Sequence, residues 1–266
     1  VFNGDPNALA TGLLGDAVRP AARALRTFDR SLSAYVWTFA GRPEGFDLAH
    51  HNVFFGLDYT QEFRDLFDIR RVPIAPTIYL CAQDRNDAGT PAQSPERFQI
   101  IMNAPADGDV VTPTEQEIRQ CETRTFERLA AAGLELAPPT AENALTTPWD
   151  FNQLFPGAGG AIYGAHPHSL MASFRRPQAR TKIAGLYLAG GSVHPGPGVP
   201  MAALSGRHAA AAILQDRAST SLSIGMDTRG GTSTGLAMTA SAASRSSASS
   251  ARFFRRITLG RGERNP

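Results

Sequence analysis

The sequence predicts a mixed fold, in which an α/β part and an α+β part occur in one chain of 266 residues. Residues 183–215 have the pattern of a buried strand, a glycine- and proline-rich loop and a helix, which is typical of α/β proteins. Between residues 31 and 104, several apolar stretches are separated by long loops and by helical segments. That pattern is typical of an antiparallel sheet in an α+β domain.

The stretch 183–215 contains its own boundary signals. The apolar run 183–189 is long enough for a strand that is covered on both faces, and Gly190 and Gly191 end it. A helix is expected to begin near Pro200, because proline fits a first helical turn whose N–H groups lack partners anyway. Small residues along this helix would permit close approach of another backbone or a flat ligand: Ala202, Ala203, Ser205, Gly206 and Ala209.

The start of this helix has a specific chemistry. A helix that follows a glycine-rich loop presents free backbone N–H groups and the positive end of its dipole, and both stabilise negative charge. The loop has no phosphate-binding lysine and is therefore not a Walker loop. Such a helix start is suited to an electron-rich ring edge, such as the pyrimidine side of a reduced flavin.

Five sequence words between residues 3 and 210 can be compared with known families. They are NGD at 3–5, LAHHNVFFGLDYTQEF at 48–63, PTIYLCAQDR at 76–85, IIMNAPADGD at 100–109 and GLYLAGGSVHPGPGVPMAALSGRHAA at 185–210. Through these words the chain resembles the carotenoid desaturases related to bacterial phytoene desaturase. Within that family it is most similar to the 1-hydroxycarotenoid 3,4-desaturases, also called methoxyneurosporene dehydrogenases.

This resemblance implies the C-terminal portion of a two-domain, FAD-dependent oxidoreductase of the amine oxidase and phytoene desaturase type. Its reaction would desaturate a carotenoid, passing a hydride to flavin and a proton to a base or solvent. The dinucleotide fingerprint GxGxxG is missing near the start, so the N-terminal Rossmann half is expected to be absent and the chain alone to be inactive. The residues that the resemblance assigns to cofactor binding are Gly190, Gly191, Ser192, Gly198, Val199, Pro200 and Met201.

The resemblance also divides the chain into four parts. Residues 1–30 would be a remnant of the FAD domain with its crossover, and residues 31–175 the substrate-binding domain. Residues 176–216 would return to the FAD domain as its strand, loop and helix. Residues 217–266 are crowded with small and polar residues and are expected to be disordered, because they cannot bury enough apolar surface.

Individual elements can be assigned from local signals. Asp5 before Pro6 is a helix N-cap and first-turn pair. The clearest helix is 113–132, for which the sequence predicts Thr112 as N-cap, Glu115 as the partner in a capping box and Gly133 as the stop. A short amphipathic helix is expected at 59–67. Strands are expected at 31–41, 48–55, 76–82 and 97–104.

Charge and composition restrict the partners. The net charge is +2, and the tail 217–266 carries eight Arg against only Asp227 and Glu263. The body is therefore mildly acidic and offers no nucleic-acid surface. No apolar run approaches a membrane span and no signal peptide is recognised, so a cytoplasmic location peripheral to the inner membrane is expected. The patch 252–257 could touch an anionic membrane, although a basic tail without a partner is the simpler interpretation.

Several histidines and cysteines are candidate site residues. His166 and His168 form an HxH pair without a convincing third ligand, and no metal site is predicted. Cys81 and Cys121 lack metal or redox spacing and are expected to be small apolar residues of an intracellular protein. His50 and His51 are expected on opposite faces of a strand, where one could point into the substrate cavity, although a structural role is favoured over a catalytic one. His194 is expected to shape the flavin loop.

A carotenoid substrate would need an apolar tunnel, and no catalytic residue can be assigned. Two alternatives stay open: a flavin amine oxidase, disfavoured because Gly191 and Ser192 replace its usual acidic residue, and a truncated product without catalytic activity. In a flavin enzyme the cofactor carries the chemistry and the protein supplies orientation. Residues that could line the tunnel, although such residues more often belong to the core, are Trp37, Phe54, Phe55, Trp149, Phe151, Phe155, Tyr163 and Met171.

Overall fold

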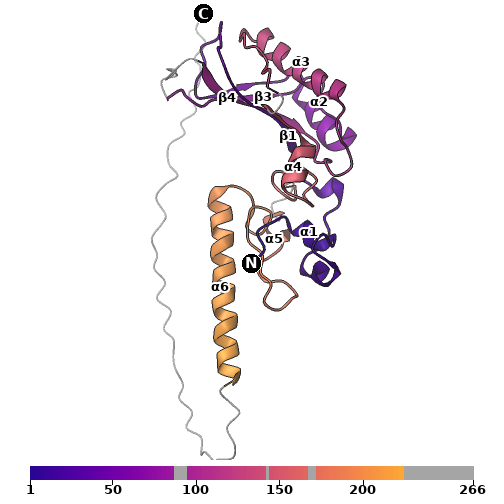
Figure 1. Cartoon of the computed structure of the whole chain (residues 1–266), viewed down its shortest axis with the longest axis vertical. Coiled ribbons are helices and arrows are strands. Elements are labelled where there is room, and N and C mark those ends of the chain that lie inside the picture. Colours follow the sequence, from indigo (N-terminus) through magenta and orange to yellow (C-terminus); the bar gives the residue numbers. More distant parts are fainter. Residues whose placement is uncertain (87–94, 142–143, 167–171, 225–266) are drawn as a thin grey trace, which may run out of the picture. The chain divides into compact units, whose positions relative to one another are not determined.

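The computed structural model describes residues 1–86, 95–141, 144–166 and 172–224. These ranges belong to one compact unit, Val1–Ile224. The second unit, Gly225–Pro266, lies outside the described residues, as does the basic patch at 252–257. The described part is a mixed α/β structure with a single named sheet (Figure 1).

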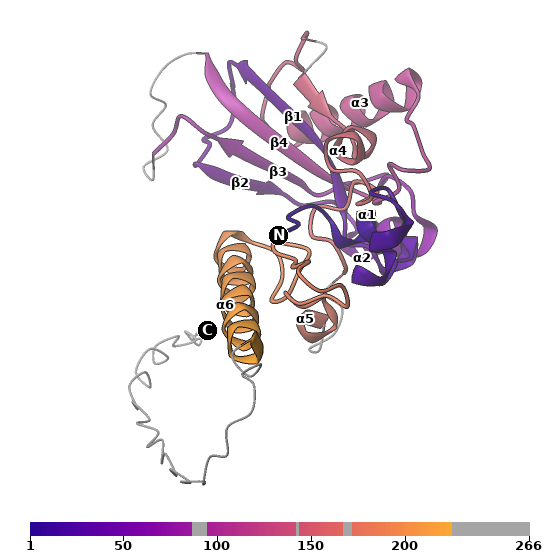
Figure 2. The ribbon, with the colours of Figure 1, turned by 60° about the horizontal axis from the view of Figure 1, so that its bottom comes forward.

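The sheet has five antiparallel strands in the order β2-β3-β4-β1-β5 (Figure 2). The four predicted strands are confirmed, and β5 is a two-residue addition at the edge. In β1 and β4 buried and partly exposed residues alternate, as expected for a sheet with one covered face. The strands are β1 Ser33–Gly41, β2 His51–Phe54, β3 Ile78–Ala82, β4 Glu96–Ala104 and β5 Leu145–Thr146.

Helix α3, Glu115–Ala131, covers one face of the sheet (Figure 1). Its residues Cys121, Phe126 and Leu129 belong to the same buried cluster as the strand residues Trp37 and Ile100. Both cysteines of the chain are free and buried. This cluster of fifteen buried residues is the main hydrophobic core.

The N-terminus of α3 differs from the prediction by two residues. Thr114, not Thr112, is the N-cap, and its capping-box partner is Glu117, not Glu115. The Thr114 hydroxyl accepts from the Glu117 N–H, and the Glu117 carboxylate accepts from the Thr114 N–H at 2.7 Å. Two overlapping threonine–glutamate pairs occur in this segment, and the sequence pattern alone did not separate them. The predicted stop is confirmed, since Gly133 has a φ of 92° just after the helix.

The segment expected to be a helix at 59–67 begins as α2, Tyr59–Phe63, with Asp58 as N-cap. It continues as one π-helical segment, η3, Arg64–Ile69, and ends at Arg70, whose φ is 58°. At the start of the chain, α1 spans Pro6–Ala10, and the Asp5 carboxylate accepts from the Asn7 N–H at 2.8 Å. The predicted Asp5–Pro6 start is thus confirmed. The remaining short helices are η1 Asp16–Ala21, η2 Thr27–Asp29, α4 Pro148–Leu154 and α5 Ala172–Arg175.

The strand expected at 183–189 is the largest local correction. Only two isolated bridges form there: Leu188 pairs in parallel with Phe2, and Tyr187 pairs antiparallel with Arg180. A turn with Gly185 at a φ of 78° replaces the first part of the strand. An apolar run becomes a strand only if neighbouring strands supply hydrogen-bond partners, and among the described residues Phe2 is its one parallel partner.

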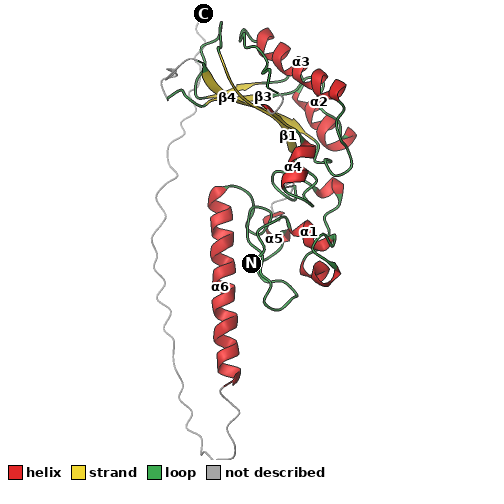
Figure 3. Ribbon diagram, in the orientation of Figure 1, coloured by secondary structure: helices red, strands yellow, loops and turns green. Residues whose placement is uncertain are grey.

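Helix α6 spans Val199–Ile224. It begins where the sequence predicts, with proline in the first turn, but it extends eight residues beyond the boundary expected at 216. Serine and alanine are tolerated in a helix, so a stretch without a core can still be helical. Among the described residues, none of the helices combines the length and hydrophobicity that crossing a membrane requires. Loops make up most of the chain around α1 and α5 (Figure 3).

Candidate functional site

The N-terminal segment lies alongside the segment that leads into the glycine-rich loop. The Phe2 N–H donates to the Tyr187 carbonyl at 2.8 Å, and the Ala189 N–H donates to the Phe2 carbonyl at 3.1 Å. These bonds place the Asn-Gly-Asp turn at 3–5 beside the loop at 190–192. Two of the sequence words, far apart in the chain, therefore form one structural unit.

Asp5 fastens this loop to α1. Its Oδ2 accepts from the Ser192 hydroxyl at 2.8 Å, while its Oδ1 caps α1. Both carboxylate oxygens therefore have a hydrogen-bond donor, and Ser192 is held by a charge-assisted bond. Ser192 is thus engaged as a structural hydroxyl, in keeping with the absence of a nucleophile-elbow pattern around it.

Arg176 also contacts this loop, and it is buried, with 5% of its area exposed. One guanidinium nitrogen donates to the Gly191 carbonyl at 3.2 Å and another donates to the Ala165 carbonyl at 2.7 Å. Burial lowers the pKa of Arg176, and the charge of Asp5 acts against this shift. Sequence reasoning missed this residue, because an arginine in a loop carries no pattern that marks it as buried.

The glycines of the loop differ in whether backbone conformation or lack of space excludes a side chain. Gly190 has a φ of 129°, and a Cβ there would lie 2.7 Å from the Asn3 amide oxygen. Gly198 has a φ of 98° with nothing within 4 Å, so the backbone alone requires it. Gly191 has neither constraint, because its φ is outside the left-handed region and a Cβ would meet only Pro197 Cα, at 3.7 Å. The chain itself therefore has room for a methyl group at Gly191.

The start of α6 is open to solvent. Val199 is 85% exposed and Met201 is 43% exposed. The first N–H groups of a helix have no partner within it, and Pro200 has no N–H. The N–H groups of Val199 and Met201 are therefore available to a ligand, as a negatively charged ring edge would require.

Two cavities adjoin the loop, and Asp5 and Ser192 line both of them. The smaller has a volume of about 250 Å³ and the larger of about 340 Å³. Gly191 and Ser192 line the smaller cavity, whereas the expected residues Gly198, Val199, Pro200 and Met201 line neither. The smaller is completed by Asn3, Gly4, Phe151, Phe155, Ala158, Gly160, Ala161 and Ile162.

Two of the histidine expectations concern this region. His194 stacks on His208 at a centroid distance of 5.9 Å and on Phe174 at 5.8 Å, and a cis peptide bond joins it to Pro195. This packing suits a residue that shapes the loop. His166 lines the larger cavity and its N–H donates to the Asp29 carbonyl, while His168 lies outside the described residues.

The expected tunnel residues divide into two groups. Trp37 and Phe54 belong to the buried core cluster, so for these two residues the core alternative holds and the tunnel one does not. Phe55, Trp149, Phe155 and Tyr163 are exposed, Phe151 is half-buried and Met171 lies outside the described residues.

The uncovered face of the sheet carries apolar residues that sequence reasoning missed. Val53 is opposite Tyr79, Tyr79 is opposite Ile101, and Ile101 is opposite Val36, so the four form one row across the strands. They alternate along their strands with residues of the core, and that alternation was the signal that could have found them.

Comparison with known proteins places these features in a family context. The model of the family "Flavin containing amine oxidoreductase" matches residues 52–214. The hydroxyneurosporene desaturase of Rubrivivax gelatinosus is 48% identical over 243 residues, covering 89% of this chain and 46% of the relative. That of Rhodobacter capsulatus is 52% identical over 219 residues, covering 82% and 43%. A 4,4'-diapolycopene oxygenase of Methylomonas sp is 33% identical over 166 residues, covering 60% and 33%. The chain spans about half the length of the first two relatives.

Proposed function

Because the chain belongs to the flavin-containing amine oxidoreductase family, we propose that it is the C-terminal part of an FAD-dependent carotenoid desaturase. The observation that carries this proposal is its identity of about one half, across most of the chain, with two hydroxyneurosporene desaturases. The substrate class is accordingly a hydroxylated carotenoid. The family itself supports FAD as the cofactor.

The residues of the loop fit a flavin. Gly191 leaves space that this chain does not use, and the exposed start of α6 offers N–H donors. Bound FAD would supply the hydride acceptor for oxidation of a carbon–carbon single bond. The chain would hold the growing negative charge with the N–H groups of Val199 and Met201, fixed in advance by the helix. We assign residues 1–30 and 176–216 to the FAD domain on this basis, with Gly190, Gly191, Ser192, Gly198, Val199, Pro200 and Met201 as its cofactor-binding residues.

Two polar groups, the half-buried Asp5 and the buried Arg176, would keep the loop in place during this step. Asp5 holds Ser192, and Arg176 holds the carbonyl oxygens of Gly191 and Ala165. A donor array stabilises charge well only if it does not reorganise during the reaction. The polar network therefore has a positioning role, while the general base stays unassigned.

The uncovered sheet face suits an apolar substrate. In its row Val53 is exposed and Val36, Tyr79 and Ile101 are partly exposed, and none of the four belongs to the hydrophobic core of the described residues. We assign residues 31–175 to the substrate-binding domain. This face of the sheet would contact the polyene chain of the substrate. A contiguous apolar row of this kind is consistent with contact to an apolar ligand.

Contact with a membrane surface would give access to such a substrate. Tyr59, Phe63 and Phe67 place adjoining rings on α2 and η3, with centroid distances of 4.8 and 5.8 Å. Leu57, just before α2, is 88% exposed. The segment 57–71 carries three arginines against four carboxylates, so its apolar side chains, not its net charge, would make the contact. Co-sedimentation with anionic vesicles should weaken when Leu57 is replaced by Asp.

Two other reactions compete with desaturation. The family description favours amine oxidation, but the relatives at about half identity are named desaturases. The Methylomonas relative is named an oxygenase, which favours oxygen insertion into a carotenoid as the second candidate. A third possibility is a product without catalytic activity, if the chain occurs without a nucleotide-binding half.

A chimera tests the proposal. The N-terminal portion of the Rubrivivax gelatinosus protein would be joined to this chain, and the purified product supplied with FAD and hydroxyneurosporene. We expect a yellow flavoprotein that adds a double bond to the carotenoid, seen as a red shift of its absorbance and a loss of two hydrogens by mass. The chimera lacking residues 183–215 is the control. A product that gains oxygen, or a chimera that binds FAD without altering the carotenoid, would contradict desaturation.

A further inference from the structure

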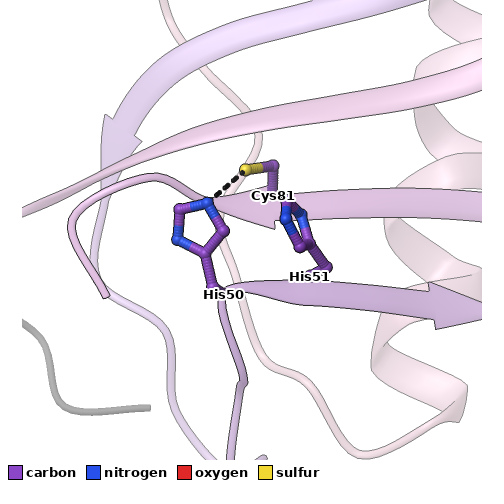
Figure 4. A group of neighbouring side chains, drawn as sticks. All are labelled: His50, His51 and Cys81. Carbon is purple, nitrogen blue, oxygen red and sulfur yellow. Dashed lines mark hydrogen bonds between the residues drawn. The ribbon is translucent and has the colours of Figure 1, made fainter. Parts of the chain in front are cut away.

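Three potential metal ligands meet where the edge strand β2 begins. His51 is the first residue of β2 and is opposite Cys81 of β3, while His50 directly precedes the strand (Figure 4). The imidazole rings of His50 and His51 are 4.3 Å apart between centroids. They do not lie on opposite sides of the strand, as alternation predicted, because His50 precedes β2. All three ligand atoms lie within 4.8 Å of one another.

The environment of His50 fixes which nitrogen can bind a metal. Its Nδ1 lies 2.8 Å from the Arg85 carbonyl oxygen, which can only accept a hydrogen bond. Nδ1 must therefore carry the proton, and Nε2 keeps a free lone pair. A carbonyl that orients the second nitrogen is the usual support of a metal-binding histidine. The Arg85 guanidinium is paired with Glu96 at 2.7 Å, which offsets its positive charge near the cluster.

The unprotonated nitrogen of His50, Nε2, points at the Cys81 sulfur. Nε2 lies 3.7 Å from the Cys81 Sγ (Figure 4). With Zn–S near 2.3 Å and Zn–N near 2.0 Å, a tetrahedral centre holds these two atoms about 3.5 Å apart. The observed separation is thus close to that of two ligands of one ion. Entry of the ion needs only a small movement of either side chain.

His51 can serve as the third ligand, and Tyr79 can support it. The Tyr79 hydroxyl lies 2.7 Å from the His51 Nδ1. A hydroxyl can accept from Nδ1–H, and the His51 Nε2 is then the nitrogen with a free lone pair. Because His51 is exposed, its ring can turn toward the sulfur without leaving the sheet.

We propose that His50, His51 and Cys81 form a binding site for a borderline-soft divalent cation of the Zn²⁺ class. Imidazole and thiolate ligands favour such ions over Mg²⁺ and Ca²⁺. Binding replaces the thiol proton of Cys81, which passes to solvent, and a water occupies the fourth position. The ion clamps the edge strand β2 to β3. The sequence concealed the site, because its ligands are thirty residues apart and meet only through strand pairing.

Cobalt titration of the full 266-residue chain tests this site. The chain would be reduced, stripped with chelator and titrated with Co²⁺, which gives a thiolate charge-transfer band and intense visible bands when it is tetrahedral. We expect one Co²⁺ per chain, displaced by Zn²⁺. Cys81→Ser should abolish the charge-transfer band, and His50→Gln should lower Co²⁺ affinity by more than about tenfold, the loss seen when even a supporting residue is removed.

Cys121→Ser and His208→Gln are the matched controls, because both residues lie outside the cluster. Each should bind Co²⁺ like the parent chain. Equal loss of the band in Cys81→Ser and Cys121→Ser, or a parent chain that takes up no Co²⁺, would overturn the proposal.

A second measurement uses the parent chain alone. Zn²⁺ should slow alkylation of Cys81 at least tenfold, read by mass spectrometry of its peptide, and should raise the Tm because the ion binds only the folded site. Alkylation of Cys81 at an unchanged rate under saturating Zn²⁺ would contradict the site without any variant.

Discussion

Two regions of this chain are held together in different ways. The sheet region, formed by β1–β4 and α3, has a core of fifteen buried residues. Among its described residues, the loop region, 1–30 and 155–201, has an apolar cluster of four buried residues. Buried Asn7, Arg30 and Arg176 are instead bonded to carbonyls and carboxylates of that region and its neighbours. Apolar burial therefore stabilises the first region, and directional hydrogen bonds shape the second.

The difference has a functional consequence. Apolar burial tolerates small shifts, whereas a buried polar network fixes one geometry, since each lost partner leaves an unsatisfied group. A loop that must hold donors in place for a cofactor benefits from the second arrangement. A sheet face that contacts an apolar substrate needs only apolar burial.

The largest expected effect is on the sheet region. Trp37 is fully buried and contacts Phe126 edge-to-face, so Trp37→Ala should lower the free energy of unfolding by about 3–5 kcal/mol. Urea unfolding of the chain measures it. Val53→Ala, on the uncovered face of the same sheet, should change stability by less than about 0.5 kcal/mol. Similar losses for both variants would mean that the two faces of the sheet are equally buried.

The loop region should respond to loss of one polar group. Arg176→Met leaves two carbonyl oxygens without their donor and should cost about 1–3 kcal/mol. In the chimera it should also weaken FAD binding. Arg180→Met is the control, because Arg180 pairs with Asp216 on the surface and should cost less than about 1 kcal/mol. An Arg176→Met variant with the stability and FAD affinity of the parent would show that the Arg176 hydrogen bonds do not position the loop.

Acid should affect the link between the two regions. The hydrogen bonds and charge of Arg30 hold the pKa of Asp109 below its ordinary value of 3.8. A lowered folded pKa contributes stability above the unfolded pKa, and that stability is lost as pH falls through the folded one. Asp109→Asn should therefore cost about 1–2 kcal/mol at neutral pH, reduced by solvent screening of a half-buried carboxylate. The gap from the parent should close at pH values below 3.8, and a gap independent of pH would exclude the ion pair as its cause.

The smallest effect separates Thr112 and Thr114, which lie two residues apart. Thr114→Ala should destabilise the chain by about 1 kcal/mol, because it removes the N-cap of α3. Thr112→Ala should have almost no effect. Thermal unfolding of both variants distinguishes them, and the reverse order would restore the helix start that the sequence pattern favoured.

The sequence predicted the sheet region well, because alternation and capping are local signals that its core reinforces. It failed where the outcome depends on distant partners. The run 183–189 lacks neighbouring strands, and Trp37 faces α3 rather than a tunnel. Arg176 and the pairing of His51 with Cys81 could not be foreseen, since both depend on contacts between distant segments. Asp5 was predicted as a cap, but its bond to Ser192 connects residues 187 positions apart.

The proposed flavin site needs the space beside Gly191. Gly191→Ala places a methyl group in that space, and within this chain the added Cβ would meet only an ordinary contact. Gly206→Ala is the matched control, since a Cβ there meets nothing within 4 Å on α6. Both variants should unfold like the parent or slightly later. In the chimera, FAD affinity should fall at least tenfold in Gly191→Ala and stay unchanged in Gly206→Ala. Parent-like FAD affinity in Gly191→Ala would mean that the flavin does not use this space.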